Sequence, residues 1–221
     1  MIAKNFGVAV PPLEPPKLVL LDRDGVVNND VGAPGVIRTE QLELTPNAAT
    51  AIGNLQRSGC HVALVTNQSC VGKGLLSKPG LDEIHALLQE MLRQGDKDAV
   101  LNAIHVCTST RRDNDPRMKP KPGMILEASR NFELESSAFQ SVFVGDTLTD
   151  LQAATAGGVS LKILVQTGYG FGLMDQEEAT LPPRLVTSTA NEELNSVTPF
   201  VYAQNLDQAV SWLLGHETGP C

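Results

Sequence analysis

Two aspartates separated by one residue, Asp22 and Asp24, come directly after a short apolar run at residues 17–21. Such a run predicts a buried strand, and a carboxylate held at its end can be aimed at an electrophile such as phosphorus. A second carboxyl group two residues later could protonate the leaving group and then activate a water molecule. An ordinary acidic turn has the same residues, so the pair alone leaves both interpretations open.

Two further polar residues follow apolar runs in the same way. Thr66 follows residues 61–65, and Asp146 follows residues 142–145. The Thr66 hydroxyl and its neighbouring N–H groups could hold a phosphate oxygen. The Asp146 carboxylate could bind Mg²⁺, a cation that prefers few carboxylates together with phosphate and water. Threonine is also a common turn residue and aspartate a common helix cap, so each position has a simpler interpretation.

Lys119 and Asp150 could complete such a site. Lys119 precedes Pro120 and Pro122, which favour a fixed local conformation over a solvated basic loop. Its ammonium group could neutralise a phosphate and the nucleophilic carboxylate together. Asp150 lies one helical turn after Asp146 and could accept a hydrogen bond from Lys119 or from a metal-bound water.

The elements that must position these residues alternate between strand and helix, which predicts an α/β, doubly wound parallel sheet. Ligands of such sheets bind outside the carboxyl ends of the strands, so residues scattered in sequence can converge there. Residues 168–196 are rich in Gly, Pro and polar residues and are expected to form a loop. The expected strands are 17–21, 61–65, 101–107, 142–145 and 161–165, and the expected helices are 47–57, 81–92, 122–131, 146–156 and 206–214.

The chain of 221 residues is long enough for one such domain, expected at 17–221 after a proline-rich extension at 1–16. Its net charge of -8 and lack of a basic run disfavour binding to nucleic acid or to anionic membranes. No stretch is apolar enough for a membrane span or a signal peptide, and the cysteines form no C-x-x-C pair. We therefore expect a cytoplasmic protein, a monomer or small homo-oligomer, whose partner is a small phosphorylated metabolite.

Four ordered motifs resemble those of the haloacid dehalogenase superfamily. They read D-x-D-G-x-x-N from residue 22, T-N-Q-S from 66, K-P-x-P-G-M from 119 and V-G-D-x-x-x-D from 144. The residues of the first three motifs are similar to those of the heptose-bisphosphate phosphatase and histidinol-phosphatase group within this superfamily. The resemblance implies a Rossmann-like core with a minimal cap domain or none.

The same resemblance implies a role for each residue. Asp22 is the expected nucleophile and magnesium ligand, and Asp24 the acid and base whose main-chain carbonyl also binds magnesium. Thr66, Asn67 and Lys119 are expected to bind phosphate. The remaining two positions are Asp146, expected to ligate magnesium, and Asp150, expected to support the site.

The chain departs from this group in the stretch before Lys119. Many members carry a zinc-binding loop of cysteines and a histidine there, but only Cys107 stands in this one, and residues 108–118 contain neither residue type. A tetrahedral site needs about four ligands, so no zinc is expected. Met118 occupies a position where members often have arginine. Arg111, Arg112 and Arg117 could contact a second anionic group of the substrate, or could simply be solvated.

The sequence thus predicts a magnesium-dependent phosphoric monoester hydrolase that acts through an aspartyl-phosphate intermediate. The expected substrate is a small phosphomonoester, such as a sugar phosphate or a heptose bisphosphate. Alternatives are histidinol phosphate or another metabolite, and a non-catalytic phosphate-binding protein on the same scaffold. A mutase is disfavoured, because residues 28–66 leave room for only one helix and a turn rather than a cap that excludes water.

Overall fold

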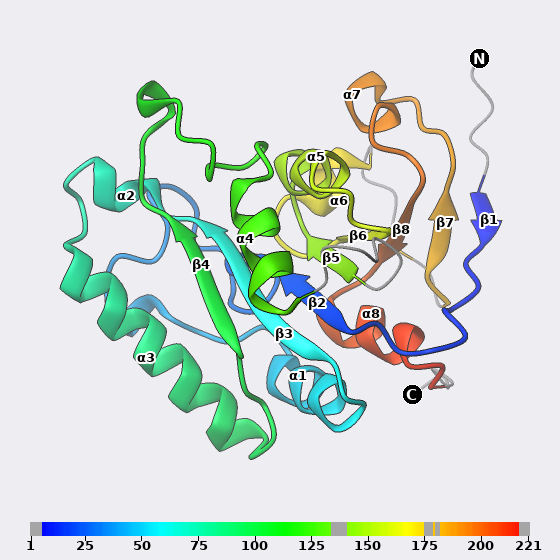
Figure 1. Ribbon diagram of the computed structural model, residues 1–221, viewed down its shortest axis with the longest axis horizontal. Coiled ribbons are helices and arrows are strands. Elements are labelled where there is room, and N and C mark those ends of the chain that lie inside the picture. The colour runs from blue at the N-terminus through cyan, green and yellow to red at the C-terminus, as the bar shows by residue number, and fades with distance from the viewer. Residues whose placement is uncertain (1–5, 134–140, 175–178, 180–181, 217–221) are drawn as a thin grey trace.

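The computed structural model describes residues 6–133, 141–174, 179 and 182–216, which form an α/β structure around one eight-stranded sheet (Figure 1). The strand order is β1-β7-β8-β6-β5-β2-β3-β4. The strands are β1 (Phe6–Val8), β2 (Leu18–Leu21), β3 (His61–Asn67), β4 (Ala103–Cys107), β5 (Ser141–Gly145), β6 (Leu161–Val165), β7 (Arg184–Val186) and β8 (Phe200–Ala203).

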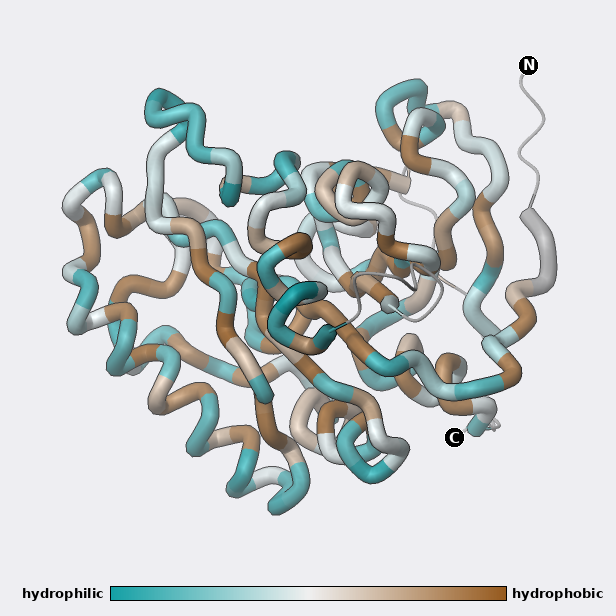
Figure 2. The backbone as a smooth tube through the Cα atoms, viewed as in Figure 1, coloured by the Kyte–Doolittle hydropathy of each residue, from teal (hydrophilic) through white to brown (hydrophobic). Residues whose placement is uncertain are grey.

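The central strands are parallel, and β2 lies between β5 and β3, in register with Leu18 opposite Ser141 and His61. Parallel sheets are covered on both faces, so their strands are apolar throughout rather than alternating. All four residues of β2 are buried, and the strands in the middle of the molecule are predominantly hydrophobic (Figure 2). β7 is antiparallel to β8 and to β1, which closes one edge of the sheet.

Helices cover both faces of the sheet, and successive side chains of one strand serve opposite layers. Val19 and Leu21 belong to the cluster that includes α1 (Ala48–Arg57), α3 (Lys78–Gly95) and α8 (Leu206–Leu213). Leu18 and Leu20 belong to the cluster that includes α4 (Gly123–Asn131) and α5 (Leu148–Ala156). The shorter helices are η1 (Thr39–Gln41), α2 (Ser69–Gly72), η2 (Arg111–Asp113), α6 (Gly170–Leu173) and α7 (Glu192–Asn195).

Helix α3 shows why the longer elements agree with the sequence. Its apolar residues recur every three or four positions, so Leu81, Ile84, Leu88 and Leu92 form one buried stripe. Ser77 caps its first turn by accepting a hydrogen bond from the Gly80 N–H at 3.1 Å. Between β2 and β3 the chain forms only η1, α1 and their connections, which confirms the expectation of a minimal cap.

The expectation of a loop over residues 168–196 is wrong. Its described residues include α6, β7 and α7, each only three or four residues long. Elements so short span barely one period of a hydrophobic pattern, too little for the pattern to repeat, and here tertiary contacts stabilise them. Strand β8 was not predicted, and within the proline-rich segment β1 was not predicted either. A hydrogen bond also holds this segment against α8, since the Trp212 indole N–H donates to the Ala9 carbonyl at 3.1 Å.

Of the helices that the structure describes, none has the length and apolar character needed to cross a bilayer.

Candidate active site

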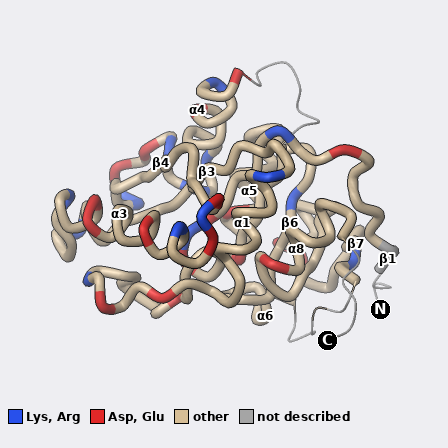
Figure 3. Tube along the Cα trace, turned by 90° about the horizontal axis from the view of Figure 1, so that it is seen from below, with Lys and Arg blue, Asp and Glu red and all other residues tan. Residues whose placement is uncertain are grey.

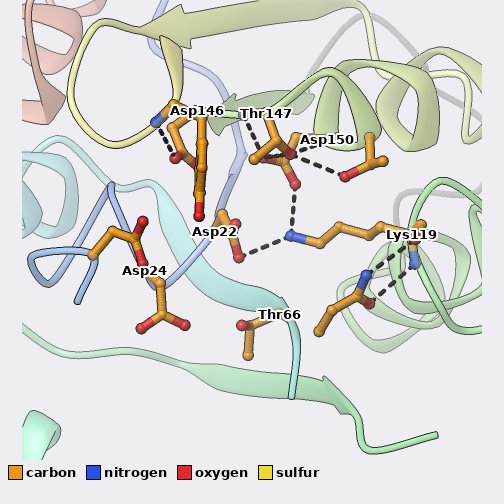
Figure 4. A pocket seen from close by; sticks show the side chains of 11 residues that line it. Asp22, Asp24, Thr66, Lys119, Asp146, Thr147 and Asp150 are labelled. Atoms are coloured by element: carbon orange, nitrogen blue, oxygen red, sulfur yellow. Dashed lines mark hydrogen bonds and ion pairs between the residues drawn. The ribbon is translucent and has the colours of Figure 1, made fainter. Parts of the chain in front are cut away.

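The polar residues singled out by the sequence lie together at the carboxyl ends of β2, β3 and β5 (Figure 4). They surround a cavity of about 160 Å³. Among the labelled side chains Asp22 lies in the middle, with Asp146 and Asp150 on one side and Thr66 and Asp24 on the other. The lining residues are Asp22, Asp24, Asp30, Thr66, Asn67, Lys119, Asp146, Thr147, Thr149, Asp150 and Tyr169. All seven predicted site residues are in this set.

Lys119 joins two of these carboxylates. Its Nζ lies 2.8 Å from Asp22 Oδ1 and 2.6 Å from Asp150 Oδ1, and the residue is almost completely buried. Burial acts to lower the pKa of Lys119, but Asp150 and Asp22 outweigh it and raise that pKa above its usual value. The ammonium group therefore stays charged beside the proposed nucleophile.

Asn67 holds Lys119 in place through its main chain. The Asn67 side chain donates to the Lys119 carbonyl at 3.0 Å and accepts from the Lys119 N–H at 3.0 Å. Both ends of the amide are thus engaged, so in this structure the Asn67 side chain orients the lysine. Its expected contact with phosphate stays a prediction.

Asp150 is held by the residue that caps its helix. Its Oδ2 accepts from the Thr147 N–H at 3.0 Å and from the Thr147 hydroxyl at 2.6 Å. Thr147 is the N-cap of α5 and Asp150 is the third helical residue, which makes a reciprocal capping box. The alternative that Asp146 is merely a helix cap is therefore excluded, because Thr147 fills that position.

Asp146 is buried, and within the described part of the chain only one of its two carboxylate oxygens has a hydrogen-bond partner. Its Oδ2 accepts from the Tyr169 N–H at 2.9 Å, whereas its buried Oδ1 has no partner among the described residues. Gly25 and Gly168 have φ angles of 82° and 62°, and a Cβ on either would lie within 2.5 Å of Asp146 Oδ2. Two glycines thus let the backbone approach this carboxylate closely.

The cavity gathers more carboxyl groups than the single charge of Lys119 can neutralise. Burial raises the pKa of Asp22 to about 7, an effect partly opposed by Lys119. Burial raises the pKa of Asp146 to about 9, with Asp150 and Asp22 adding to it. Ligand oxygens of Asp22, Asp146 and Asp150 lie within 4.8 Å of one another. An unpaired buried oxygen in an all-oxygen, electron-rich site fits a hard divalent cation such as Mg²⁺.

Asp24 has a different environment. Burial acts to raise its pKa, but the Arg23 guanidinium and hydrogen bonds from Asn28 and Gln68 outweigh it and hold that pKa below its usual value. One fold thus gives two neighbouring carboxyl groups opposite pKa shifts, a pattern typical of active sites.

A second cavity of about 780 Å³ adjoins the first, and both are lined by Asn67, Lys119 and Thr149. Its described lining has no acidic residue but includes Lys73, Arg111 and Arg112. Along the chain as a whole, basic and acidic residues are interspersed (Figure 3). The three arginines differ in their surroundings, and contact of any of them with substrate stays a prediction. Arg111 and Arg112 line the cavity, whereas Arg117 pairs with Glu127, Nε to Oε1, at 2.9 Å.

The loop before Lys119 is organised around a carboxylate. Asp115 Oδ2 accepts from the Ser109 hydroxyl at 2.5 Å and from the Cys107 thiol at 3.6 Å, and its Oδ1 accepts from the Arg117 N–H at 2.8 Å. Within the described residues, Asp22, Asp146 and Asp150 form the one cluster of His, Cys, Asp or Glu suited to a metal ion. The absence of zinc stays a prediction.

Sequence reasoning missed several residues that line the catalytic cavity. Thr147 and Thr149 lie inside the V-G-D-x-x-x-D stretch, so their position was available. Asp30 follows the first motif and Tyr169 follows β6, and neither carries a local signal of function. Only the fold brings their segments to the cavity.

Comparison with known proteins agrees with this geometry. The family model of haloacid dehalogenase-like hydrolases matches residues 20–158. The D-glycero-beta-D-manno-heptose-1,7-bisphosphate 7-phosphatase of Neisseria meningitidis is 36% identical over 166 residues, covering 75% of this chain and 86% of that protein. The D-glycero-D-manno-heptose-1,7-bisphosphate 7-phosphatase of Thermosynechococcus vestitus is 32% identical over 215 residues, covering 91% and 97%.

A solved structure is similar over nearly the whole chain. It is the D,D-heptose 1,7-bisphosphate phosphatase of B. bronchiseptica in complex with magnesium and phosphate, with a TM-score of 0.75 and 30% sequence identity. The alignment covers 90% of this chain and 98% of that one. The match of the family model, together with relatives of this identity and coverage, shows that the chain belongs to the haloacid dehalogenase-like hydrolases and is a phosphoric monoester hydrolase among them.

Proposed function

We propose that the protein is a magnesium-dependent phosphatase that hydrolyses one phosphomonoester of a sugar bisphosphate through a covalent intermediate on Asp22. The observation that supports this most directly is the buried Asp22–Lys119–Asp150 array beside Asp146. In this array the Asp22 carboxylate and the Lys119 ammonium group are held in fixed positions, and the Asp146 carboxylate beside them has one oxygen unpaired among the described residues, all around one small cavity.

In the first step, an oxygen of Asp22 forms a bond to phosphorus and the bond from phosphorus to the leaving oxygen breaks. Lys119 already contacts Asp22 Oδ1, so the second oxygen is the one that attacks, and the lysine offsets charge on the phosphoryl group. Asp24 donates a proton to the leaving alkoxide, which departs as an alcohol.

In the second step, a water oxygen attacks the phosphorus of the aspartyl phosphate. Asp24 takes a proton from that water, the bond between phosphorus and Asp22 breaks, and inorganic phosphate is released. Asp22 returns as a carboxylate and Asp24 as an acid, so the cycle closes with one water consumed.

Asp22, Asp146 and the Asp24 main-chain carbonyl are the proposed magnesium ligands. When bound, magnesium supplies positive charge that stabilises the developing charge on the transferring phosphoryl group. Thr66 lies across the cavity from Asp146 and is the proposed hydrogen-bond donor to a phosphoryl oxygen.

Two observations support a bisphosphate as the substrate. The relatives named above act on heptose 1,7-bisphosphates. In this chain the larger cavity adjoins the catalytic one and carries Lys73, Arg111 and Arg112, suited to a second, non-reacting phosphate. The same cations would repel the ammonium group of histidinol phosphate, so that alternative is disfavoured.

The test is a comparison of heptose 1,7-bisphosphate with heptose 7-phosphate and histidinol phosphate, each with and without Mg²⁺. We expect magnesium-dependent phosphate release, with the highest kcat/KM for the bisphosphate. Asp22→Asn should abolish turnover while the circular dichroism spectrum stays unchanged.

A double variant, Arg111→Ala with Arg112→Ala, should lower kcat/KM for the bisphosphate about tenfold or more and leave that for the monophosphate within about threefold. Arg117→Ala is the matched control, since Arg117 pairs with Glu127 instead. Near-normal activity of Asp22→Asn would refute the mechanism. An equal loss on both substrates would refute the second phosphate site.

A further inference from the structure

Arg23, which separates the two catalytic aspartates in sequence, is fully buried. Its guanidinium lies inside the protein rather than in the substrate cavity, whose lining does not include it. A buried charge costs several kcal/mol unless it is paired and hydrogen bonded, so a guanidinium here needs a structural or functional reason.

The partner of Arg23 is the carboxylate of Asp24. Arg23 Nη2 lies 3.0 Å from both Asp24 Oδ1 and Asp24 Oδ2. Asn28 Nδ2 donates to Oδ1 at 3.0 Å, and Gln68 Nε2 donates to Oδ2 at 2.9 Å. Every contact is a donated hydrogen, which stabilises the ionised carboxylate that Asp24 becomes once it has protonated the leaving group, the form that abstracts a proton from water in the second step.

Gln68 extends this arrangement to the phosphate side of the cavity. Its carbonyl oxygen accepts from Arg23 Nη2 at 3.0 Å, and its Nε2 donates to the Thr66 hydroxyl at 2.9 Å. Gln68 therefore fixes Asp24 relative to Thr66, the proposed phosphate contact. Those two residues must face the same phosphoryl group for a water to be aligned between base and phosphorus.

His85 of α3 contacts the Arg23 guanidinium through its other terminal nitrogen, Nη1. Its Nε2 lies 3.3 Å from Arg23 Nη1, and because a guanidinium can only donate, the imidazole accepts and is neutral. His85 is itself buried, so Arg23 has little freedom to move. The Asp24 carboxylate is thus held by a side chain whose own position is fixed by packing.

We propose that Arg23 is a positioning residue of the phosphatase reaction, which together with Gln68 holds the Asp24 carboxylate where it serves as general base on the aspartyl phosphate. This inference rests on the proposed function. It assigns to a residue outside the cavity a specific effect on the second step.

The experiment uses dinitrophenyl phosphate, whose leaving group departs without a proton. With it, kcat/KM reports formation of the aspartyl phosphate, whereas kcat reports its hydrolysis when that step is slow. For Arg23→Met with Mg²⁺ we expect kcat to fall about 10- to 100-fold, less than the roughly 10²- to 10⁴-fold that a general base contributes, because the base is misplaced rather than removed. We expect kcat/KM to stay within about threefold. KM then falls together with kcat.

Two further readouts are expected for Arg23→Met. A pre-steady-state burst of dinitrophenolate should approach one equivalent per enzyme, and acid quenching should trap phosphoryl-enzyme that is detectable by mass. Arg57→Met is the control, because the partners of Arg57 are Asp96, Asp98 and Asn54, none of which lines the catalytic cavity. It should show none of these changes.

Gln68→Met carries the test if Arg23→Met does not fold, since it removes one hydrogen bond from Asp24 without leaving a buried charge. The same split between kcat and kcat/KM, at a smaller magnitude, is expected. Equal losses in both parameters, an unchanged kcat, or a variant without burst or trapped phosphoryl-enzyme would overturn the inference. A wild-type enzyme that hydrolyses neither dinitrophenyl phosphate nor a sugar phosphate would instead refute the proposed function.

Discussion

Replacing Lys119 with methionine tests whether its charge both stabilises the fold and assists catalysis. The ammonium group contacts Asp22 and Asp150 at 2.8 and 2.6 Å, and none of the three side chains is more than 13% exposed. Methionine has a similar length and keeps the packing, but it leaves two buried carboxylates without their cation. Breaking a buried pair by removing one partner costs about 3–5 kcal/mol, or about 10 °C in Tm for a chain of this size.

The loss of activity follows from the same contact. Lys119 contacts Asp22, the proposed nucleophile, so its charge is expected to counter the negative charge that accumulates on the phosphoryl group in the transition state. Removing one such preorganised group typically lowers kcat by about 10²- to 10³-fold. We expect this reduction with the sugar bisphosphate under saturating Mg²⁺, measured as phosphate release. Addition of Mg²⁺ should recover part of the stability but not the rate.

Lys121→Met is the matched control. Lys121 lies two residues away and contacts only the main chain and side chain of Asn114. It should keep kcat/KM within about threefold and lose less than about 1 kcal/mol, as surface substitutions usually do. If Lys119→Met and Lys121→Met lose equal stability, or if Lys119→Met keeps wild-type kcat/KM, the assigned role of the buried ammonium group is wrong.

Three further outcomes follow from the acidic cavity. The metal-free protein should lose unfolding free energy as the pH rises from about 4 to 9. The reason is that Asp22 and Asp146 have folded pKa values of about 7 and 9, above the ordinary 3.8, so both bind protons more tightly in the folded state. Thermal melts with EDTA that show no such decline would contradict this. Mg²⁺ should raise Tm more at pH 8 than at pH 6, where it competes with protons, and Asp146→Asn should reduce that shift, as differential scanning fluorimetry can check. Gly168→Ala would place a Cβ 2.0 Å from Asp146 Oδ2 at a φ of 62°, so it should lower both Tm and activity, whereas Gly215→Ala, which has a similar φ of 67° and open space around it, should lower Tm alone.

The long, strongly patterned elements could be predicted because their signals are local. The apolar stripe of α3 and the buried runs of β2, β3, β5 and β6 agree with the expected ranges to within a few residues. The short elements could not, since β7 and α7 are stabilised by partners distant in the chain. Strand β1, for example, exists because it pairs with β7, about 180 residues later.

The site shows the same division. The residue types, and the strand ends that precede most of them, predicted that six polar residues lie together, because parallel strands present their carboxyl ends at one edge. These residues are Asp22, Asp24, Thr66, Lys119, Asp146 and Asp150. The distinction between Arg117 and the other two arginines was not available, because it depends on the position of Glu127 on α4. The entry of Tyr169 into the cavity lining likewise depends on β6 lying beside β5.

The sequence by itself determined the family and predicted the nucleophile and the order of the reacting groups, because these depend on residue type and on spacing within single segments. Tertiary structure decided the burial of those groups and the charges and hydrogen-bond partners around them. It buried Lys119 between two carboxylates, left one oxygen of Asp146 without a partner, and enclosed Arg23 against Asp24 and His85. Burial and the distance between charges set pKa values and orientation, and both arise only when segments far apart in the chain pack together.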